Sequence, residues 1–322
     1  MAFPTQSIDL NTVFSAHGRE YLKRTPTDNF YKGNPALAMM KKKSKKLSGG
    51  RYFIEPILQG GEPVGGSYGR AEALPTTPAD PVTEAVYEAS FYGEPVTIFY
   101  QDEVRAGGAG AMFDYVETRV EDSRLKLDRK LAGHLLASSQ AKSTDILPLS
   151  SHISTSATLG GIAPGTYTWW VAQADSSVVF SSGGLDALRN IINDASFGGI
   201  KRPDVIVMTQ SIWESYVDLV EGAGSLNYSP GGAAGRKGDL GFPVVSYQGI
   251  DVIWDRNQIS GRIDLINHDG LYLAEQEGGA WKMGDFAPLH VNGQQGRIAY
   301  IRWCGQTITR HRQSQATITS VT

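Results

Sequence analysis

The sequence has a single cysteine, Cys304, among its 322 residues. One thiol cannot form a disulfide within the chain, and a reducing compartment suits such a protein best. Cys304 follows Trp303 in a predicted strand, so we expect it to be buried rather than reactive. The sequence also lacks a run of eighteen apolar residues, which excludes a conventional membrane-spanning helix, and residues 1–12 lack the features of a secretion signal. We therefore expect neither secretion nor a membrane partner.

Catalytic and cofactor motifs are equally scarce. The six histidines are scattered, without an H-E-x-x-H pair, and there is no C-x-x-C, so no metal site is predicted. The glycine-rich stretches are never followed by Gly-Lys-Ser/Thr, and none gives a convincing G-x-G-x-x-G after a strand. We therefore predict no cofactor and no enzymatic activity. The 37 glycines favour many turns and extended loops instead.

One catalytic pattern does occur, at residues 65–69. Gly65-Gly66-Ser67-Tyr68-Gly69 matches G-x-S-x-G, the nucleophile elbow of the α/β-hydrolases. That elbow requires a buried strand before the serine and a helix after it, whereas Pro63 precedes this pattern and Pro75 and Pro78 interrupt any long helix. The glycine-rich tip of a loop explains the pattern better, and a Ser67-dependent hydrolase is a remote alternative.

Charge is distributed unevenly along the chain, although the net charge is only -3. Residues 1–59 carry ten Lys or Arg against four Asp or Glu, and residues 297–322 carry four Arg and no acid. A basic run stands out at Lys41, Lys42, Lys43, Lys45 and Lys46. Three interpretations stay open for this run: a solvated face, contact with packaged nucleic acid or an acidic neighbour, and a nuclear localisation signal. No aromatic residue interleaves with the lysines, so any nucleic-acid contact would involve phosphates.

The first strongly patterned segments predict a pair of strands. Residues 51–58 and 82–100 are rich in β-branched and aromatic residues. The segment between them, 59–81, is rich in Gly and Pro and has little to bury. A two-stranded arm is marginally stable by itself in water, so we expect this arm to rest on another copy of the chain.

The clearest helix is predicted over residues 111–138, about 40 Å long. Its apolar residues recur at spacings of three, four or seven, which places them on one face. They are Phe113, Val116, Val120, Leu127, Leu131 and Leu135. Acids fill the first half and bases the second, which allows i,i+4 pairs such as Asp122 with Lys126.

The second half of the chain predicts a smaller α/β unit followed by strands. A helix around residues 185–192, a buried strand at 204–208 and a helix at 211–221 precede a glycine-rich loop at 222–241. Six further strands complete an α+β protein. They are predicted at residues 244–247, 250–254, 263–267, 271–274, 298–303 and 316–321.

Several segments together resemble the major capsid proteins of tailed bacteriophages that share the Hong Kong phage-type capsid fold. They are ALAMMKKKSKKLSGGRYFIEPIL (36–58), TLGGIAPGTYTWW (158–170), LRNIINDASFGGIKRPDVIVMTQSIWESYVDLV (188–220) and IAYIRWCGQTITRHRQSQATI (298–318). The resemblance runs nearly from end to end. It implies a subunit of four parts: an N-terminal arm at 1–50, an extended β-hairpin loop at 51–102, a peripheral domain at 103–183 and 264–322 with 111–138 as its spine helix, and an axial domain at 184–263.

The resemblance also implies a function. Such subunits assemble through pentamers and hexamers into an icosahedral shell around double-stranded DNA, within the virion, after assembly in the host cytoplasm. A separate scaffolding protein and a portal are the expected partners. Because the sequence begins almost at the arm, we expect that any scaffold is a separate protein or that the chain is already mature. An encapsulin-like compartment that encloses a protein cargo is the alternative. In some relatives, an isopeptide bond from a lysine of the extended loop crosslinks the subunits of the shell. Residues 52–125 contain no lysine, so we expect no such crosslink here.

Contacts between subunits are expected to involve the extended loop. Its candidate contact residues are Glu62, Tyr68, Arg70, Glu72, Glu84 and Glu88. We expect the acidic loop to meet basic residues of an adjacent copy, with the lysine run and the arginine-bearing C-terminal segment as the candidate acceptors.

Overall fold

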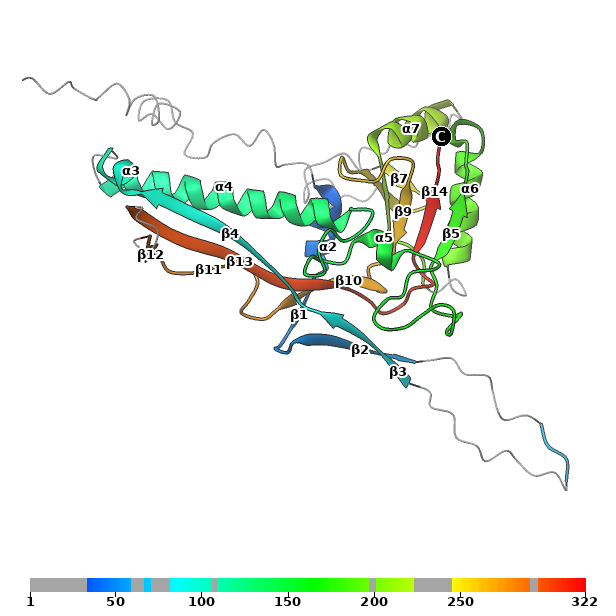
Figure 1. Cartoon of the computed structure of the whole chain (residues 1–322). Coiled ribbons are helices and arrows are strands. Elements are labelled where there is room, and N and C mark those ends of the chain that lie inside the picture. Colours follow the sequence, from blue (N-terminus) through cyan, green and yellow to red (C-terminus); the bar gives the residue numbers. More distant parts are fainter. Residues whose placement is uncertain are drawn as a thin grey trace, which may run out of the picture.

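The computed structural model describes residues 34–58, 67–70, 82–105, 109–196, 201–222, 245–289 and 295–322. A long helix, α4 (Ala109–Leu135), lies along an extended sheet, and a second sheet with its own helices stands at one end of it (Figure 1). A two-stranded hairpin projects from the molecule on the side of the first sheet that faces away from α4 (Figure 1). No described helix is long and apolar enough to span a membrane.

The first sheet is built around two long strands, β4 (Ser90–Phe99) and β13 (Gly296–Thr309). They pair antiparallel along their whole length, from Ser90 opposite Gly305 to Phe99 opposite Gly296. The other edge of β13 pairs in turn with β12 (Ala287–Pro288), β11 (Lys282–Met283) and β10 (Leu271–Gln276). A short strand, β1 (Lys45–Leu47), pairs parallel with β10.

Helix α4 covers one face of this sheet. Leu127, Leu131 and Leu135 are buried against the inward residues of β4 and β13, so the predicted apolar face is confirmed in its second half. Asp122 and Lys126 form the predicted i,i+4 ion pair at 2.6 Å. The helix begins two residues before its predicted start and ends three residues before its predicted end. Short helices flank it, α3 (Tyr100–Arg105) and α5 (Leu149–His152).

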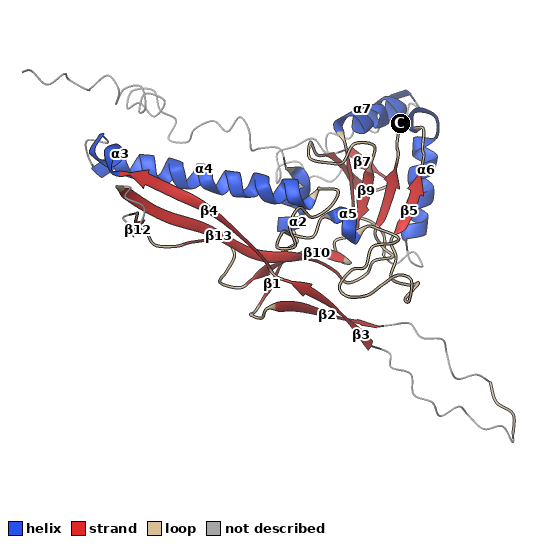
Figure 2. Ribbon diagram, in the orientation of Figure 1, coloured by secondary structure: helices blue, strands red, loops and turns tan. Residues whose placement is uncertain are grey.

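The second sheet contains six strands and is covered by two helices, α6 (Phe180–Ala195) and α7 (Gln210–Gly222) (Figure 2). Its central strand β6 is buried at every position because its sequence is a continuous apolar run. The strand order is β5 (Gln173–Ser176), β14 (Ala316–Thr319), β9 (Ile263–Ile266), β6 (Val205–Met208), β8 (Ile250–Trp254) and β7 (Val245–Tyr247).

This strand order bears on the division into domains. Strands β5, β9 and β14 lie in the same sheet as β6, although the predicted boundaries assign most of their residues to the peripheral part. A division by sheet would therefore move residues 173–176, 264–266 and 316–319 to the axial part. The four-part division stays a prediction, and most of the predicted axial loop, from residue 223 onward, lies outside the described residues.

The projecting hairpin consists of β2 (Tyr52–Leu58) and β3 (Val82–Glu88). They pair antiparallel from Tyr52 opposite Glu88 to Leu58 opposite Val82, which confirms the predicted pairing. The single strand predicted over residues 82–100 is wrong, because the chain breaks at Ala89 into β3 and β4, and β4 turns away to pair with β13. The Gln306 side chain stabilises the break by donating to the Glu88 carbonyl at 2.9 Å and to Ser90 Oγ at 3.0 Å.

Candidate assembly interface

The hairpin has one face packed on its own chain. Burial alternates strictly along β2, so every second side chain points inward. The inward residues of the two strands join a core cluster that contains the 158–170 segment and the far face of the first sheet. The residues of this hairpin inner face are Phe53, Glu55, Ile57, Ala85 and Tyr87. The hairpin base is thus an integral part of the subunit.

A buried acid fixes the hairpin inner face in position. Glu55 is only 7% exposed, accepts a hydrogen bond from the Tyr272 hydroxyl at 2.9 Å and forms an ion pair with Arg310. Burial and the bond to Glu55 raise the pKa of Tyr272, so the phenol stays a donor. On the neighbouring strand, the Tyr87 hydroxyl donates to the Thr309 carbonyl at 3.0 Å. The hairpin is therefore attached to β10 and to the end of β13 by directional bonds.

Gly160 brings the 158–170 segment against the hairpin. Its carbonyl accepts the Val86 amide at 3.0 Å, and its φ of +61° lies in the left-handed region. A Cβ at this position would stand 2.7 Å from the Ala85 Cβ, closer than van der Waals contact allows. Glycine is therefore required here for two reasons, the backbone conformation and the close approach of β3.

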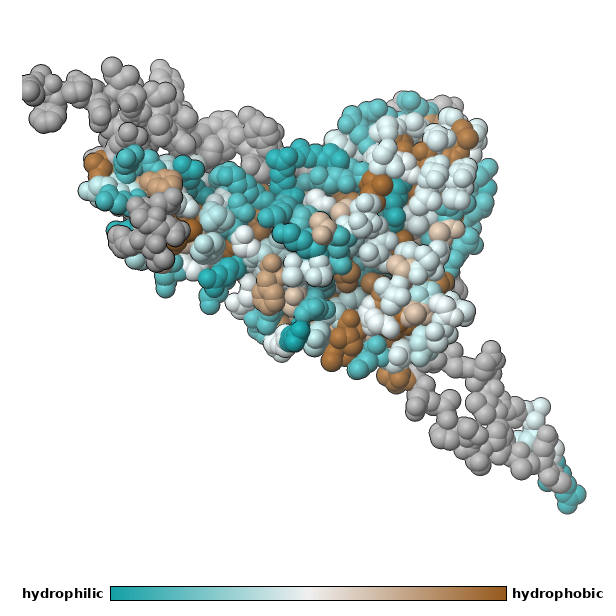
Figure 3. Space-filling model, in the orientation of Figure 1, coloured by the Kyte–Doolittle hydropathy of each residue, from teal (hydrophilic) through white to brown (hydrophobic). Residues whose placement is uncertain are grey.

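The opposite face of the hairpin points to solvent. Ile54 is 56% exposed and Leu58 78%, which is unusual for strand residues of this size. Hydrophobic surface residues are visible along the edge of the molecule from which the hairpin projects (Figure 3). The hairpin outer face is defined by the cross-strand pairs Tyr52–Glu88, Ile54–Val86, Pro56–Glu84 and Leu58–Val82. It is an apolar surface that carries two carboxylates.

The predicted contact residues are distributed as follows. Glu84 and Glu88 lie on the hairpin outer face, and Glu88 pairs with Arg51 at 3.4 Å. Tyr68 and Arg70 are exposed in a short irregular segment. Glu62 and Glu72 lie outside the described residues. The structure thus brings two of the six together on one surface.

The same short segment bears on the hydrolase alternative. Ser67 is exposed, and residues 67–70 contain neither a strand nor a helix. The strand-to-helix turn that would hold a nucleophile is therefore not formed by these four residues. Within the described ranges no cluster of three or more His, Cys, Asp or Glu is arranged to hold a metal ion.

Lysines of the basic run contact their own chain. Lys41, at the end of helix α2 (Pro35–Lys42), pairs with Asp128 of α4 and lies 3.9 Å from the centre of the Trp281 ring. Lys45, in β1, lies 4.0 Å from the centre of the Tyr272 ring. Lys43 pairs with Asp204. Lys42 and Lys46 are exposed. These contacts could not be predicted from residue spacing, because each partner lies far away along the chain.

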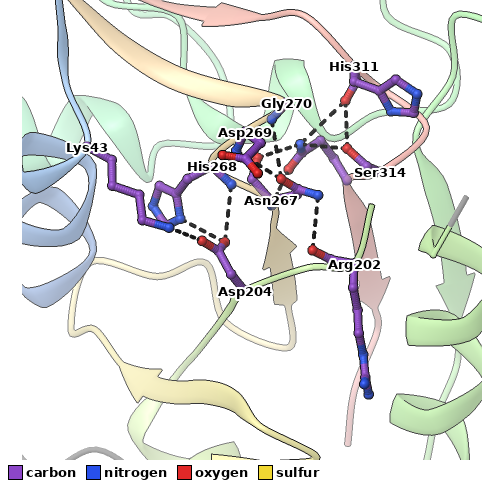
Figure 4. A network of polar contacts seen from close by, with 10 residues as sticks. Lys43, Arg202, Asp204, Asn267, His268, Asp269, Gly270, His311 and Ser314 are labelled. Atoms are coloured by element: carbon purple, nitrogen blue, oxygen red, sulfur yellow. Dashed lines mark hydrogen bonds and ion pairs between the residues drawn. The ribbon is translucent and has the colours of Figure 1, made fainter. Parts of the chain in front are cut away.

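Asp204 is the centre of a polar network between the two sheets (Figure 4). It accepts from His268 Nδ1 at 2.8 Å and from the His268 amide at 3.1 Å, and Lys43 reaches it from the other side. Burial opposes ionisation, but the bond and charge of His268, and then those of Lys43, outweigh it and lower the pKa of Asp204 to about 2. The turn at His268 therefore carries a hydrogen-bond partner of Asp204.

Residues 34–47, called the strap below, join the two halves of the subunit. At its start, the Ala36 amide donates to Asp255 Oδ2 at 3.3 Å, next to the end of β8. At its end, β1 adds to the first sheet, and Met40 is buried in the core under α4. The strap is thus held by hydrogen bonds, ion pairs and apolar packing from both sheets.

This architecture defines a class. A long helix on a long sheet, a second α/β unit, a projecting hairpin and an N-terminal strap are the Hong Kong phage-type capsid fold, as predicted from the sequence. No protein-family model and no curated protein matches the chain.

Solved structures give the particular likenesses. The capsid subunit of Cyanophage A-1(L) is similar over 94% of this chain and 96% of its own, with a TM-score of 0.67 and 17% identity. The capsid protein of the native GTA particle covers 95% of both chains, with a TM-score of 0.64 and 10% identity. The SrpI encapsulin of Synechococcus elongatus covers 100% of this chain and 96% of its own, with a TM-score of 0.59 and 10% identity.

Proposed function

We propose that this chain is the major capsid protein of a tailed bacteriophage and acts by assembly rather than by catalysis. Copies associate as pentamers and hexamers that close into an icosahedral shell around double-stranded DNA. The observation that carries the proposal is the hairpin outer face, an exposed apolar surface on a projecting element, in a chain that is similar to a capsid subunit over 94% of its length. Large exposed apolar surfaces on soluble proteins mark interaction sites.

The mechanism is mutual burial between copies. Ile54, Leu58 and Val82 are more than half exposed in the single subunit. Burial of such a side chain from full exposure is worth about 1.5–3 kcal/mol, and these partly covered side chains gain a fraction of that. The free energy gained from one such contact is modest. Every subunit both provides and receives one contact, so the total free energy gained grows with the number of subunits in the closed shell. Assembly therefore stabilises the hairpin, and the hairpin in turn holds the shell.

The remaining partners follow from the same proposal. Lys46 is exposed, and phosphate contacts through such a residue would be independent of DNA sequence and weakened by salt. A separate scaffolding protein and a portal complete the head, which is assembled in the host cytoplasm and becomes part of the virion. No crosslink from a lysine of the extended loop is expected, because residues 52–125 carry no lysine.

An encapsulin-like shell is the second candidate. The likeness to the SrpI encapsulin over the full length of this chain supports it. Both candidates require the same shell, and they differ in what the shell encloses. Cargo therefore distinguishes them.

The test is assembly of the purified chain, followed by electron microscopy and analysis of the contents. We expect uniform hollow shells from the protein alone or with its scaffolding protein, and nuclease-resistant DNA in particles from infected cells. A protein cargo without DNA would favour the encapsulin candidate. A subunit that stays monomeric across protein concentration, salt and scaffold conditions would overturn both.

A further inference from the structure

Tyr272 of β10 contacts both the strap and the hairpin. Its hydroxyl donates to Glu55 Oε2 at 2.9 Å, and Glu55 belongs to the hairpin inner face. On the strap, the Lys45 ammonium lies 4.0 Å from the centre of the Tyr272 ring. Tyr272 is 2% exposed, so its ring is held in place by the surrounding core. The strap and the hairpin therefore bind two parts of one buried side chain.

The pairing of β1 with β10 places Lys45 on the hairpin side of the first sheet. Lys45 is opposite Ala274, two residues after Tyr272 along β10. Side chains alternate along a strand, so Lys45 and Leu47 point to the side on which the hairpin packs, whereas Lys46 points to the other side. In agreement with this, Leu47 packs against the core cluster that contains Tyr272 and the hairpin inner face. The backbone of β1 thus holds Lys45 over the ring.

Charges of alternating sign extend this contact beyond the ring. Arg310 forms an ion pair with Glu55 on the far side of the Tyr272 hydroxyl. The structure shows no ion pair of Lys45 with any residue that it describes. A cation over an aromatic ring draws electron density towards itself, which makes the hydroxyl on that ring a stronger donor. Lys45 therefore strengthens the bond from Tyr272 to Glu55. These four side chains are called the Tyr272 network below.

The order of the elements along the chain adds a second link. Only residues 48–51 separate the end of β1 from the start of β2. The Arg51 carbonyl accepts the Ala89 amide at 3.4 Å, so the same short connection also contacts the end of β3. A displacement of β1 therefore acts on the base of the hairpin through the backbone as well as through the Tyr272 network.

We propose that the Tyr272 network couples the strap to the hairpin, so that the hairpin is held firmly only in a subunit whose strap is in place. The coupling is reciprocal, because Glu55 and Arg310 also fix the ring that receives Lys45. This inference rests on the proposed function, in which the hairpin outer face is the contact surface. A hairpin already held in one orientation loses less conformational entropy when a neighbour covers it. The strap thus regulates how ready the subunit is to assemble.

Hydrogen exchange of the unassembled subunit tests the coupling. The Val86 amide donates to the Gly160 carbonyl, so its exchange rate reports detachment of the hairpin. Lys45→Ala should raise that rate roughly two- to fivefold, the factor that a cation–π contact at an exposed site contributes. Lys45→Arg keeps a cation over the ring and should stay near the wild type. Lys46→Ala removes the same charge from the other side of the sheet, and as the matched control it should also stay near the wild type.

A second set of variants separates coupling from a general loss of stability. Tyr272→Phe keeps the ring but removes the hydroxyl that reaches Glu55, so it should itself raise the exchange rate of the Val86 amide. Adding Lys45→Ala to it should then raise the rate no further. Glu55→Gln weakens the same bond from its other end, and in that background the effect of Lys45→Ala should also shrink.

Two results would overturn the coupling. One is an unchanged Val86 exchange rate in Lys45→Ala, and the other is an equal rise from Lys45→Ala with and without Tyr272→Phe. Both are measured on single subunits, so either result would leave the shell function standing. Failure of the wild-type chain to form shells would instead count against the function.

Discussion

The strap and the hairpin have similar features in the sequence. Each is a short segment with a regular pattern of apolar residues, and each lies next to a stretch that is rich in glycine or lacks such a pattern. In the structure they differ in how they are covered. The strap makes its contacts within its own subunit. Met40 is buried in the core, and Lys43 forms an ion pair with Asp204. The hairpin is packed against its own subunit on one face only. On its outer face, Ile54 and Leu58 are exposed to solvent.

This difference separates two tasks. A segment whose contacts are all internal sets the shape of the subunit, whereas a segment with an uncovered apolar face provides binding energy for a neighbour. Substitutions in the strap should therefore affect the free energy of unfolding of the single subunit. Substitutions on the hairpin outer face should affect association instead.

The largest effect is expected from Met40→Ala. Met40 is 1% exposed in the core under α4, and truncation of such a residue costs about 2–5 kcal/mol in unfolding free energy. Ile54→Ala is the matched control on the hairpin outer face, where a change of about 0.5 kcal/mol or less is expected in the unassembled subunit. Urea unfolding measures both. Equal losses in the two variants would remove the distinction between strap and hairpin.

An intermediate effect is expected from Gly160→Ala, which tests the attachment of the hairpin. The new methyl group would meet Ala85, so we expect a loss of roughly 1–3 kcal/mol beyond the backbone cost. Gly161→Ala shares the positive φ but has open space around its Cβ, so it isolates the backbone cost.

Hydrogen exchange at the Val86 amide reports this attachment directly, because that amide donates to the Gly160 carbonyl. Protection should fall in Gly160→Ala and largely persist in Gly161→Ala. Adding Ala85→Gly to the Gly160→Ala chain should restore it. Equal loss of protection in both single variants would show that the close approach to β3 is unimportant.

The smallest effect is expected at Asp204 and depends on pH. Its pKa in the folded chain is about 2, below the ordinary value of 3.8, so its ionised form stabilises the folded state. That contribution is complete above about pH 4 and is lost as the pH falls through 2. The urea midpoint of Asp204→Asn should therefore lie below that of the wild type at pH 5 and approach it towards pH 2.5.

Asp186→Asn serves as the control, since Asp186 is exposed on α6 and forms an ion pair with nearby Arg189. Its midpoint should follow the wild type throughout this range. A gap between Asp204→Asn and the wild type that stays constant from pH 5 to 2.5 would contradict the lowered pKa of Asp204.

Local periodicity predicted much of the fold. The apolar spacing of Leu127, Leu131 and Leu135 is a property of one helix, and the alternation in residues 51–58 is a property of one strand, so both could be inferred from neighbouring residues. The continuous apolar run at Val205–Met208 likewise marked a buried strand. Burial of Cys304 was also predicted correctly.

The candidate site was predicted less completely, because its contacts are long-range. Lys43 and Asp204 are 161 residues apart, and Glu55 and Arg310 are 255 apart, so composition and spacing carry no signal for either pair. The break at Ala89 depends on Gln306, again from a distant strand. Sequence alternation identified which hairpin residues share a face, but not which face the subunit covers.

The buried state of the sole cysteine has a practical consequence. Cys304 is 3% exposed, its thiol donates to Gln276 Oε1 at 2.9 Å, and burial raises its pKa, so a maleimide dye has no reactive native target in the described fold. A Leu58→Cys substitution would then place one reactive thiol on the hairpin outer face, and Cys304 would not have to be replaced. Fluorescence from that single dye could follow the meeting of two subunits in real time.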